Sequence, residues 1–375
     1  MPCVVFYVSG HGFGHASRVI EVINALQAKA PRVTVHVRTS AARWLFDLTV
    51  RGRITLDHAT TDVGVVQLDS LTPDLEATLD RAAAFHAGAD RWADAEARRL
   101  LAVKASLVVA DLPPLALVAA DRAGVPSVGL SNFTWDWIYE DYARRLGVAS
   151  ALPDAIRRAH ARAREAWRLP MHGGFEGFAR VIDVPLVARR ATRPAAETRE
   201  ALGLPAGRPI VLVSFGGYGL EGLALDDVVA TGRWTIVTAG GTAGAGSGDA
   251  RPAASCGDRL HRVDEAGLYA AGFRYEDLVA ASDVVVTKPG YGIVSECIAN
   301  ETAIVYTSRG PFAEYDVLVA QMPRWLRCAY VDQTDLRAGR WHGALDQALS
   351  APSPPERPPT DGAAVLADRI LDWCD

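Results

Sequence analysis

Two histidines stand in a glycine-rich turn near the start of the chain, in the run Gly10-His11-Gly12-Phe13-Gly14-His15. An imidazole is the side chain that most readily takes up and returns a proton near neutral pH. The glycines permit backbone conformations that side chains forbid, and they let a ligand approach the main chain. The turn predicts proton transfer by His11 or His15, with Gly12 and Gly14 close to the ligand. The alternative is that one histidine caps a helix and the other is solvated.

The elements on either side of this turn predict where it lies. The apolar run Val4–Val8 predicts a buried strand, and the spacing of apolar residues from Val19 to Leu26 predicts a helix. Open α/β sheets bind ligands at the carboxyl ends of their strands, which is where such a turn stands. The turn is not a dinucleotide-binding fingerprint, because His15 stands where that motif has its third glycine. It is not a phosphate loop either, because no Gly-Lys-Ser/Thr follows.

A carboxylate ends another apolar strand of the first half, in Ser106–Asp111. The carboxyl ends of parallel strands meet at one edge of a sheet, so Asp111 is expected on the same rim as His15. A carboxylate in that place can fix the tautomer of a histidine and stabilise its protonated form. A turn or helix-cap aspartate is the alternative.

A second informative segment follows the strand Asp283–Thr287 and runs from Lys288 through Gly290-Tyr291-Gly292 to Glu296. A glycine turn at a helix N-terminus presents free N–H groups to phosphate, and Lys288 adds a positive charge. Glu296, one to two turns into the helix, is placed to accept hydrogen bonds from a ribose diol; an ordinary helix glutamate is the alternative. The strand Ile210–Phe215, which contains Ser214, leads into a similar turn at Gly216, Gly217 and Tyr218.

Large aromatic residues follow the predicted strand Val125–Leu130. Asn132, Trp135, Trp137 and Tyr139 are predicted to form the wall of a site for a ring-shaped ligand. Core packing is the alternative for each of these aromatic side chains. Farther on, a helix is expected from Pro153 to Arg168, followed by a loop at 171–175.

Composition excludes several classes of protein. A formal net charge of −5 gives no electrostatic reason to expect a nucleic-acid partner. No apolar run is long enough to cross a membrane, and the chain shows no signal peptide. The five cysteines are scattered, without metal-ligand spacing, which fits the reducing cytoplasm. We therefore expect a cytoplasmic protein, whose oligomeric state the sequence leaves open.

The chain, 375 residues long, is too long for one ordinary core, and its second half repeats the strand and glycine-turn plan of the first. Loop-forming residues between Pro185 and Pro209 place a boundary near residue 186. The expected units are an N-terminal domain, 1–185, a C-terminal domain, 186–360, and a terminal helix, 361–375.

Two α/β halves with these turns resemble the GT-B glycosyltransferases. The resemblance is strongest to the glycosyltransferase-like N-terminal region of L-arabinokinases. It extends to the inverting peptidoglycan N-acetylglucosaminyltransferase and to plant-type glucosyltransferases. The segments that carry it, over nearly the whole chain, are Val8–Arg18, Ser131–Tyr139, Asp183–Pro185 and Ala281–Glu296. The kinase half of an arabinokinase, with its phosphate loop, is absent from this sequence.

The resemblance implies an α/β fold of two Rossmann-like domains that face each other across a cleft, with the C-terminal helix packed back on the N-terminal domain. The first domain would bind a small-molecule or glycan acceptor, and the second a nucleoside-diphosphate sugar, with UDP or TDP as its nucleotide. His15 would be the general base, with His11 as the substitute and Asp111 orienting it. The donor-side turns and Glu296 would bind the nucleotide, and Glu314 and Asp316 lie near the place where related enzymes hold the donor sugar. The sequence lacks the Trp-x-Pro-Gln segment of the plant-type enzymes, and their Asp-Gln or Glu-Gln pair does not stand at that place. It also lacks an Asp-x-Asp metal motif.

The expected activity is therefore metal-independent, inverting sugar transfer, with no cofactor besides the donor. Two other functions stay open. The chain could bind sugar nucleotides as a regulatory module without turnover, because the similar region of arabinokinases is an attached domain. It could also be a GT-B epimerase or hydrolase that acts on the nucleotide sugar alone.

Overall fold

The apolar run at the start of the chain forms strand β1 (Cys3–Val8), in which every residue is buried. Burial on both faces is typical of a central strand in a parallel sheet. The computed structural model of the chain describes residues 1–216, 223–239 and 259–374. In it, β1 lies within a sheet whose strand order is β3-β2-β1-β6-β7-β8-β9. All neighbouring strands of this sheet pair in parallel.

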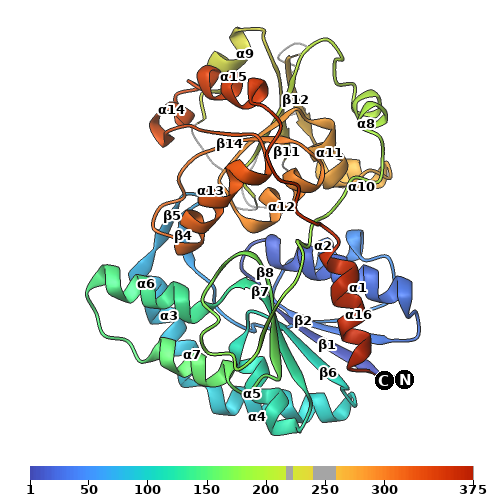
Figure 1. The fold of residues 1–375 in the computed structure, drawn as a ribbon, viewed down its shortest axis with the longest axis vertical. Helices are drawn as coiled ribbons and strands as arrows, with labels where there is room; N and C mark the ends of the chain where they lie inside the picture. The colour runs from blue at the N-terminus through green and yellow to red at the C-terminus, as the bar shows by residue number, and fades with distance from the viewer. Residues whose placement is uncertain (217–222, 240–258, 375) are drawn as a thin grey trace, which may run out of the picture.

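Helices connect most of the parallel strands of this N-terminal half, and they cover both faces of the sheet (Figure 1). The other strands are β2 (Thr34–Thr39), β3 (Thr55–His58), β6 (Leu107–Asp111), β7 (Ser127–Phe133), β8 (Glu165–Gly173) and β9 (Val181–Asp183). The helices are α1 (Gly14–Lys29), α2 (Arg43–Thr49), α3 (Leu75–Ala87), α4 (Ala89–Ala102), α5 (Pro114–Ala123), α6 (Trp135–Leu146) and α7 (Leu152–His160).

The C-terminal half repeats this plan, with a described strand order of β12-β11-β10-β13-β14-β15, all parallel. Its strands are β10 (Ile210–Ser214), β11 (Thr235–Ala239), β12 (Leu260–Val263), β13 (Val284–Thr287), β14 (Ala303–Tyr306) and β15 (Cys328–Tyr330). Its helices are α8 (Ala195–Ala201), α9 (Leu225–Ala230), α10 (Glu265–Ala270), α11 (Tyr275–Ala281), α12 (Tyr291–Ala299), α13 (Ala313–Trp325), α14 (Gln333–Arg337) and α15 (His342–Ser350). The predicted two-domain α/β architecture is confirmed.

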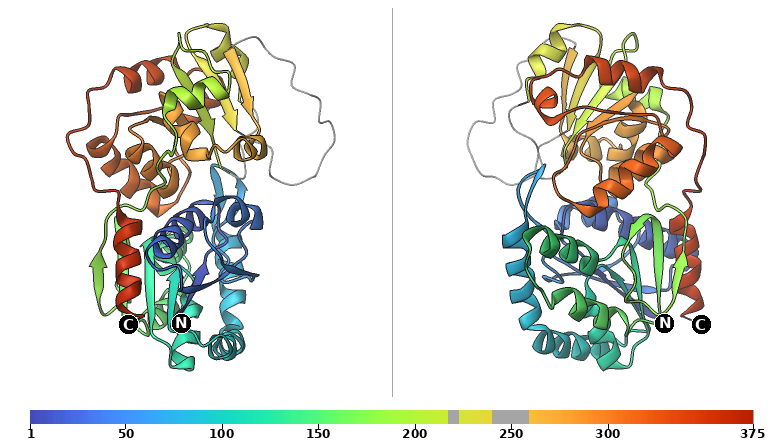
Figure 2. Two further views of the ribbon diagram at one scale, coloured as in Figure 1. Left: turned by 90° about the vertical axis from the view of Figure 1, so that its right-hand side faces the viewer. Right: turned by 60° about the vertical axis from the view of Figure 1, so that its left-hand side comes forward.

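The last helix, α16 (Gly362–Asp372), returns to the N-terminal lobe and lies beside α1 in both Figures 1 and 2. Its buried residues Leu366 and Ile370 join the same hydrophobic cluster as Ile20 and Ile23 of α1. At the surface, Lys29 Nζ donates to Asp368 Oδ1 at 2.5 Å. The expected packing of the C-terminal helix on the N-terminal half is therefore confirmed.

A small antiparallel hairpin, β4 (Val66–Asp69) and β5 (Thr72–Asp74), projects from the N-terminal lobe to the other lobe (Figure 2). Leu71 at its tip is only 1% exposed and belongs to the hydrophobic cluster of the C-terminal sheet. Ser70 Oγ donates to the carbonyl of Phe215 at 3.1 Å. The hairpin thus anchors the two halves to each other beside the turn that follows β10.

The chain between 153 and 173 differs from the expectation. The helix that was expected to reach Arg168 ends at His160, and residues expected in a helix and a loop form strand β8. Residues 167–172 alternate between buried and less buried positions, as is typical of a strand. The arginine-rich composition of this stretch concealed that period of two.

Candidate active site

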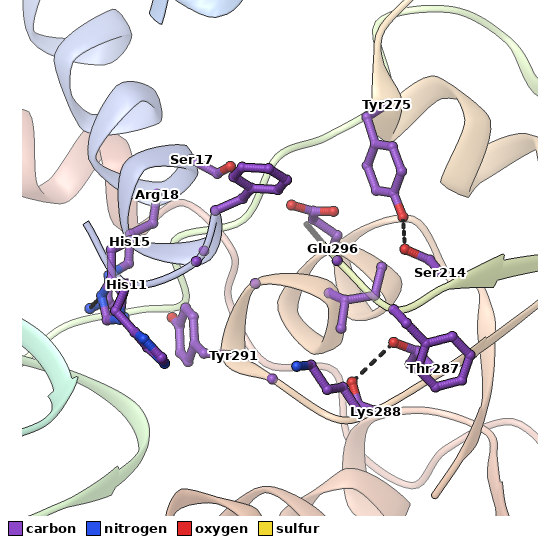
Figure 3. Close-up of a pocket in the computed structure, with 18 of the residues that line it drawn as sticks. His11, His15, Ser17, Arg18, Ser214, Tyr275, Thr287, Lys288, Tyr291 and Glu296 are labelled. Carbon is purple, nitrogen blue, oxygen red and sulfur yellow. Dashed lines mark hydrogen bonds between the residues drawn. The ribbon is translucent and has the colours of Figure 1, made fainter. Parts of the chain in front are cut away.

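A cavity of about 500 Å³ lies between the two halves, where the carboxyl ends of the central strands of both sheets meet. The N-terminal half contributes the turn after β1 and residues at the end of β7. The C-terminal half contributes the turns after β10, β13 and β14. Figure 3 shows side chains from both halves pointing into this space.

His15 and Asp111 form a pair at the N-terminal wall of the cavity. His15 lies in the first turn of α1, and Asp111 ends β6, the strand next to β1. The Nδ1 atom of His15 is 3.1 Å from Asp111 Oδ1, and Asp111 is fully buried. Nε2 of His15 has no hydrogen-bond partner among the described residues, and His15 lines the cavity. The predicted meeting of these two side chains is therefore present in the structure.

Arg18 is a third member of this group, which sequence reasoning did not single out. It lies one helical turn after His15, and its Nε donates to Asp111 Oδ2 at 2.7 Å. Burial alone would raise the pKa of Asp111, but Arg18 and then His15 hold that pKa below its usual value. Asp111 is therefore an ionised carboxylate that two neighbours share.

His11 lies beside this group but in another environment. Its Nδ1 accepts a hydrogen bond from the main-chain N–H of Val65 at 3.4 Å, and its ring packs edge-to-face against Trp135. Burial, followed by the electrostatic influence of the neighbouring His15, Arg309 and Lys288, lowers the pKa of His11 to about 3. His11 is therefore a neutral imidazole with Nδ1 already engaged.

The glycine turns of the two halves meet across the cavity. A Cβ added to Gly292 would lie 3.4 Å from the Cα of Gly14, so the first turns of α1 and α12 touch. Neither helix has a side-chain cap at its N-terminus. Their free N–H groups and the positive ends of their dipoles therefore converge, which is an arrangement that favours an anion.

Lys288 stands next to these helix ends, after β13. Its Nζ donates to the carbonyl of Ser70, in the hairpin, at 2.6 Å. Burial, with a smaller contribution from Arg309, lowers the pKa of Lys288 to about 7. A lysine with that pKa gains a proton readily when an anion binds beside it.

Glu296 faces the cavity from the second turn of α12 (Figure 3). Its Oε1 accepts from both Nε and Nη2 of Arg189, at 2.7 and 2.6 Å. Oε2 has no hydrogen-bond partner among the described residues. Burial, opposed by Arg189, raises the pKa of Glu296 to about 7. Nearby, Ser214 Oγ and the hydroxyl of Tyr275 are 2.5 Å apart.

Glu314 joins the two halves. Its Oε1 accepts from Asn132 Nδ2 at 2.8 Å, and its Oε2 accepts from Arg309 Nη1 at 3.0 Å. Arg18 Nη1 donates to Asn132 Oδ1 at 2.7 Å, which fixes the orientation of that amide. A continuous polar chain therefore runs from Asp111 through Arg18 and Asn132 to Glu314.

Comparison with known proteins finds a curated relative of this chain. The chain is 31% identical over 350 residues to an L-arabinokinase of Arabidopsis thaliana, a match that covers 92% of this chain and 32% of the relative. The chain thus spans about a third of the length of that curated relative. No family model matches the chain.

Solved structures share the whole architecture. The glycotransferase of kitacinnamycin matches over 100% of both chains, with a TM-score of 0.64 and 17% identity. Phytolacca americana UGT2, solved with UDP-2-fluoro-glucose and pterostilbene, matches over 100% of this chain and 95% of its own, with a TM-score of 0.59 and 12% identity. The fold is that of the GT-B glycosyltransferases. The predicted resemblance to this fold and to L-arabinokinase is confirmed.

Most of the predicted residues line the cavity of this GT-B fold. They are His11, Gly12, Gly14, His15, Asn132, Ser214, Gly216, Lys288, Gly290, Tyr291, Gly292, Glu296 and Glu314. Asp111 stands behind His15. Gly217 and Tyr218 lie outside the described residues. Asp316, on an exposed position of α13, does not line the cavity.

The prediction that Trp135, Trp137 and Tyr139 form an aromatic wall of the site is wrong. Trp135 and Tyr139 are each 1% exposed, stack on each other in the core and do not line the cavity; Trp137 does not line it either. Trp135 Nε1 donates to buried Asp62, and the Tyr139 hydroxyl donates to the carbonyl of Gly64. These partners draw the polar ends of both rings inward, away from the cavity.

Other aromatic residues form the wall instead: Phe13 and Trp44, which pack edge-to-face at 5.5 Å, together with Phe133 and Phe312. Phe13 lies within the glycine turn itself, so its position in that motif could have identified it as a cavity residue.

Across the described residues, no helix has the length and apolar character of a membrane span. The same residues contain no group of three or more His, Cys, Asp or Glu that could hold a metal ion.

Proposed function

We propose that this protein is a metal-independent, inverting glycosyltransferase. It moves a sugar from a nucleoside-diphosphate sugar to a hydroxyl group of a small-molecule or glycan acceptor. One observation carries the proposal: the His15–Asp111 pair and the converging N-termini of α1 and α12 line the same cavity. A base and an anion site that share one cavity are what transfer from a diphosphate requires.

The N-terminal unit, 1–185, carries the base and, in Phe13, Trp44 and Phe133, most of the aromatic acceptor wall, and the C-terminal unit, 186–360, holds the donor. Residues 361–375 return to the first unit. The diphosphate would lie at the N–H groups around Gly14 and Gly292, beside Lys288. Arg309 lines the cavity there and stacks on Phe312 at 4.0 Å. These groups would stabilise the negative charge that grows on the departing diphosphate.

The nucleoside would extend toward Glu296. Arg189 occupies one carboxylate oxygen and leaves Oε2 able to accept from a ribose hydroxyl. This supports UDP over TDP, because deoxyribose offers one hydroxyl fewer. The Phytolacca americana neighbour that was solved with UDP-2-fluoro-glucose and pterostilbene supports the same donor class and an aromatic acceptor. Glu314 would accept from hydroxyls of the donor sugar.

The reaction would be a single displacement. His15 Nε2 takes the proton from the acceptor hydroxyl, and the acceptor oxygen forms a bond to the anomeric carbon. The bond from that carbon to the diphosphate breaks, and its electron pair leaves with the diphosphate. Attack opposite the leaving group inverts the anomeric carbon. His15 is favoured over His11 because the Nδ1 of His11 is occupied and its pKa is too low for a base at neutral pH.

Turnover with a panel of nucleotide sugars and hydroxyl acceptors, in the presence of EDTA, tests the proposal. We expect diphosphate release that depends on acceptor, with an α-linked donor giving a β-linked product by NMR. Release without acceptor would instead indicate a hydrolase. Binding of nucleotide without any release would indicate the regulatory module that the partial match to L-arabinokinase leaves open.

A further inference from the structure

Gln67 brings a side-chain amide into the cavity from the hairpin that crosses between the two halves. It is the second residue of β4 and lines the cavity, whereas the next residue, Leu68, is 72% exposed. Successive side chains of a strand point to opposite sides, so the hairpin presents Gln67 to the cavity and Leu68 to solvent. Among the residues that the structure describes, the amide of Gln67 has no hydrogen-bond partner.

Contacts on either side of Gln67 fix its place in the cavity. Two residues earlier, the main-chain N–H of Val65 donates to His11 Nδ1 at 3.4 Å. Three residues later, the carbonyl of Ser70 accepts from Lys288 Nζ at 2.6 Å. The chain between these contacts runs from the turn that carries the proposed base to the turn beside the proposed diphosphate site. Gln67 lies between the two, which is where the sugar must lie during transfer.

The other strand of the hairpin leads to the loop before Glu314. In the hairpin, Gln67 is paired with Pro73 of β5. A Cβ added to Gly310 would lie 2.9 Å from Pro73 Cδ, so the hairpin touches the loop that follows β14. Arg309, the residue before that glycine, donates to Glu314 Oε2 at 3.0 Å. Gln67 and Glu314 therefore belong to the same end of the cavity, one from each half.

This end of the cavity differs from the end that would hold the ribose. Lys288, which the hairpin contacts, has Glu314 among its charged neighbours. Glu296 instead receives two hydrogen bonds from Arg189. Gln67 is therefore placed to contact the sugar of the donor and not its nucleoside.

An amide suits the recognition of sugar hydroxyl groups. A hydroxyl both donates and accepts hydrogen bonds, and an amide offers a carbonyl acceptor and two N–H donors. Glu314 offers only acceptors, and both of its oxygens already accept, from Asn132 and from Arg309. Gln67 adds donors without placing a negative charge beside the diphosphate. A site that hydrogen-bonds a hydroxyl group of its substrate disfavours an analogue that lacks this group.

We propose that Gln67 is a specificity-determining residue for the donor sugar, and that its amide hydrogen-bonds a hydroxyl group of that sugar. The hairpin gives the acceptor half of the protein a part in the choice of donor. The inference rests on the proposed function, because it requires a nucleotide-sugar donor.

Calorimetric titration of the wild type and of Gln67→Met with UDP, UDP-glucose, UDP-galactose and UDP-xylose tests the proposal. Methionine nearly keeps the length of the side chain and loses the amide. UDP affinity should stay unchanged, because UDP carries no sugar. The affinity for at least one UDP-sugar should fall about 2- to 13-fold, as expected for one hydrogen bond between uncharged groups. A sugar of the panel that lacks or inverts the contacted hydroxyl should lose less.

Leu68→Met is the matched control, because it changes the adjacent residue on the solvent side of the same strand. It should leave all four affinities unchanged. If Gln67→Met weakened UDP and the UDP-sugars by the same factor, or left every affinity at its wild-type value, the proposal would be overturned. These outcomes would leave the proposed function standing. Wild-type protein that binds no nucleotide and no nucleotide sugar would instead refute the proposed function, and this inference would fall with it.

Discussion

Gly14 and Gly292 face each other across the cavity so closely that a Cβ on Gly292 would lie 3.4 Å from the Cα of Gly14. The two residues belong to the first turns of α1 and α12, one from each half. Glycine at both places lets two helix N-termini approach one anion, while His15 is the residue next to Gly14. This contact places the proposed base and the proposed diphosphate site within one cavity.

Replacing His15 should separate chemistry from binding. In His15→Ala we expect kcat to fall about 10²–10⁴-fold, the usual contribution of a general base, with nucleotide affinity within a few-fold of wild type. His11→Ala, in the same turn, should lose much less, because His11 is neutral and its Nδ1 is engaged by Val65. Turnover and calorimetric titration measure the two effects. Equal losses in both variants would remove His15 from its special role.

Glu296→Gln should weaken ribonucleotide binding. At pH 8 or above, where a carboxyl group with a pKa of about 7 is mostly ionised, a hydrogen bond to this charged group contributes about 1.5–3 kcal/mol, so the dissociation constant of a ribonucleoside diphosphate should rise about 10- to 150-fold. The 2′-deoxy nucleotide provides the control, because it makes fewer bonds to Oε2 and should lose less. If both nucleotides weakened equally, the ribose would have to bind elsewhere.

Lys288 should make donor binding depend on pH. Its pKa is about 7 in the empty protein, and a bound diphosphate favours the charged form and raises that pKa. Binding therefore takes up a proton above pH 7, and affinity should fall as pH rises from 7 to 9, by at most about tenfold per unit. A nucleotide sugar is the proper ligand, since its diphosphate lacks the ionisation near pH 6 of a terminal phosphate. In Lys288→Met we expect weaker binding whose affinity no longer falls from pH 7 to 9; a fall that survives in this variant would come from another group.

The hairpin should contribute stability through Leu71, whose side chain is 1% exposed in the core of the other half. Leu71→Ala should lower the free energy of unfolding by about 2–5 kcal/mol, as leucine truncations in cores do. Leu68→Ala in the same hairpin is the control, because Leu68 is 72% exposed and its loss should stay within about 0.5 kcal/mol. Similar losses in denaturant melts of both variants would contradict this docking.

The two glycine turns and the meeting of His15 with Asp111 could be predicted because parallel strands bring their carboxyl ends to one edge. Arg18 and Arg189 could not, because their carboxylate partners lie 93 and 107 residues away and arginine is common in this chain. The helix pattern placed Trp135 and Tyr139 together but did not show which face they occupy. Their buried partners, Asp62 and the carbonyl of Gly64, decide that they belong to the core.

The most direct test of the account is nucleotide binding by the wild-type protein and by Lys288→Met. A thermal-shift panel of UDP, TDP, GDP, ADP and CMP, with their common sugars, measures it. A ligand at about 100 times its dissociation constant stabilises a protein by roughly 2.7 kcal/mol, which corresponds to a shift of a few degrees. We expect a clear shift with UDP or a UDP-sugar that is much reduced in Lys288→Met. No shift with any nucleotide, in protein shown to be folded, would contradict the assignment of the cavity as a donor site.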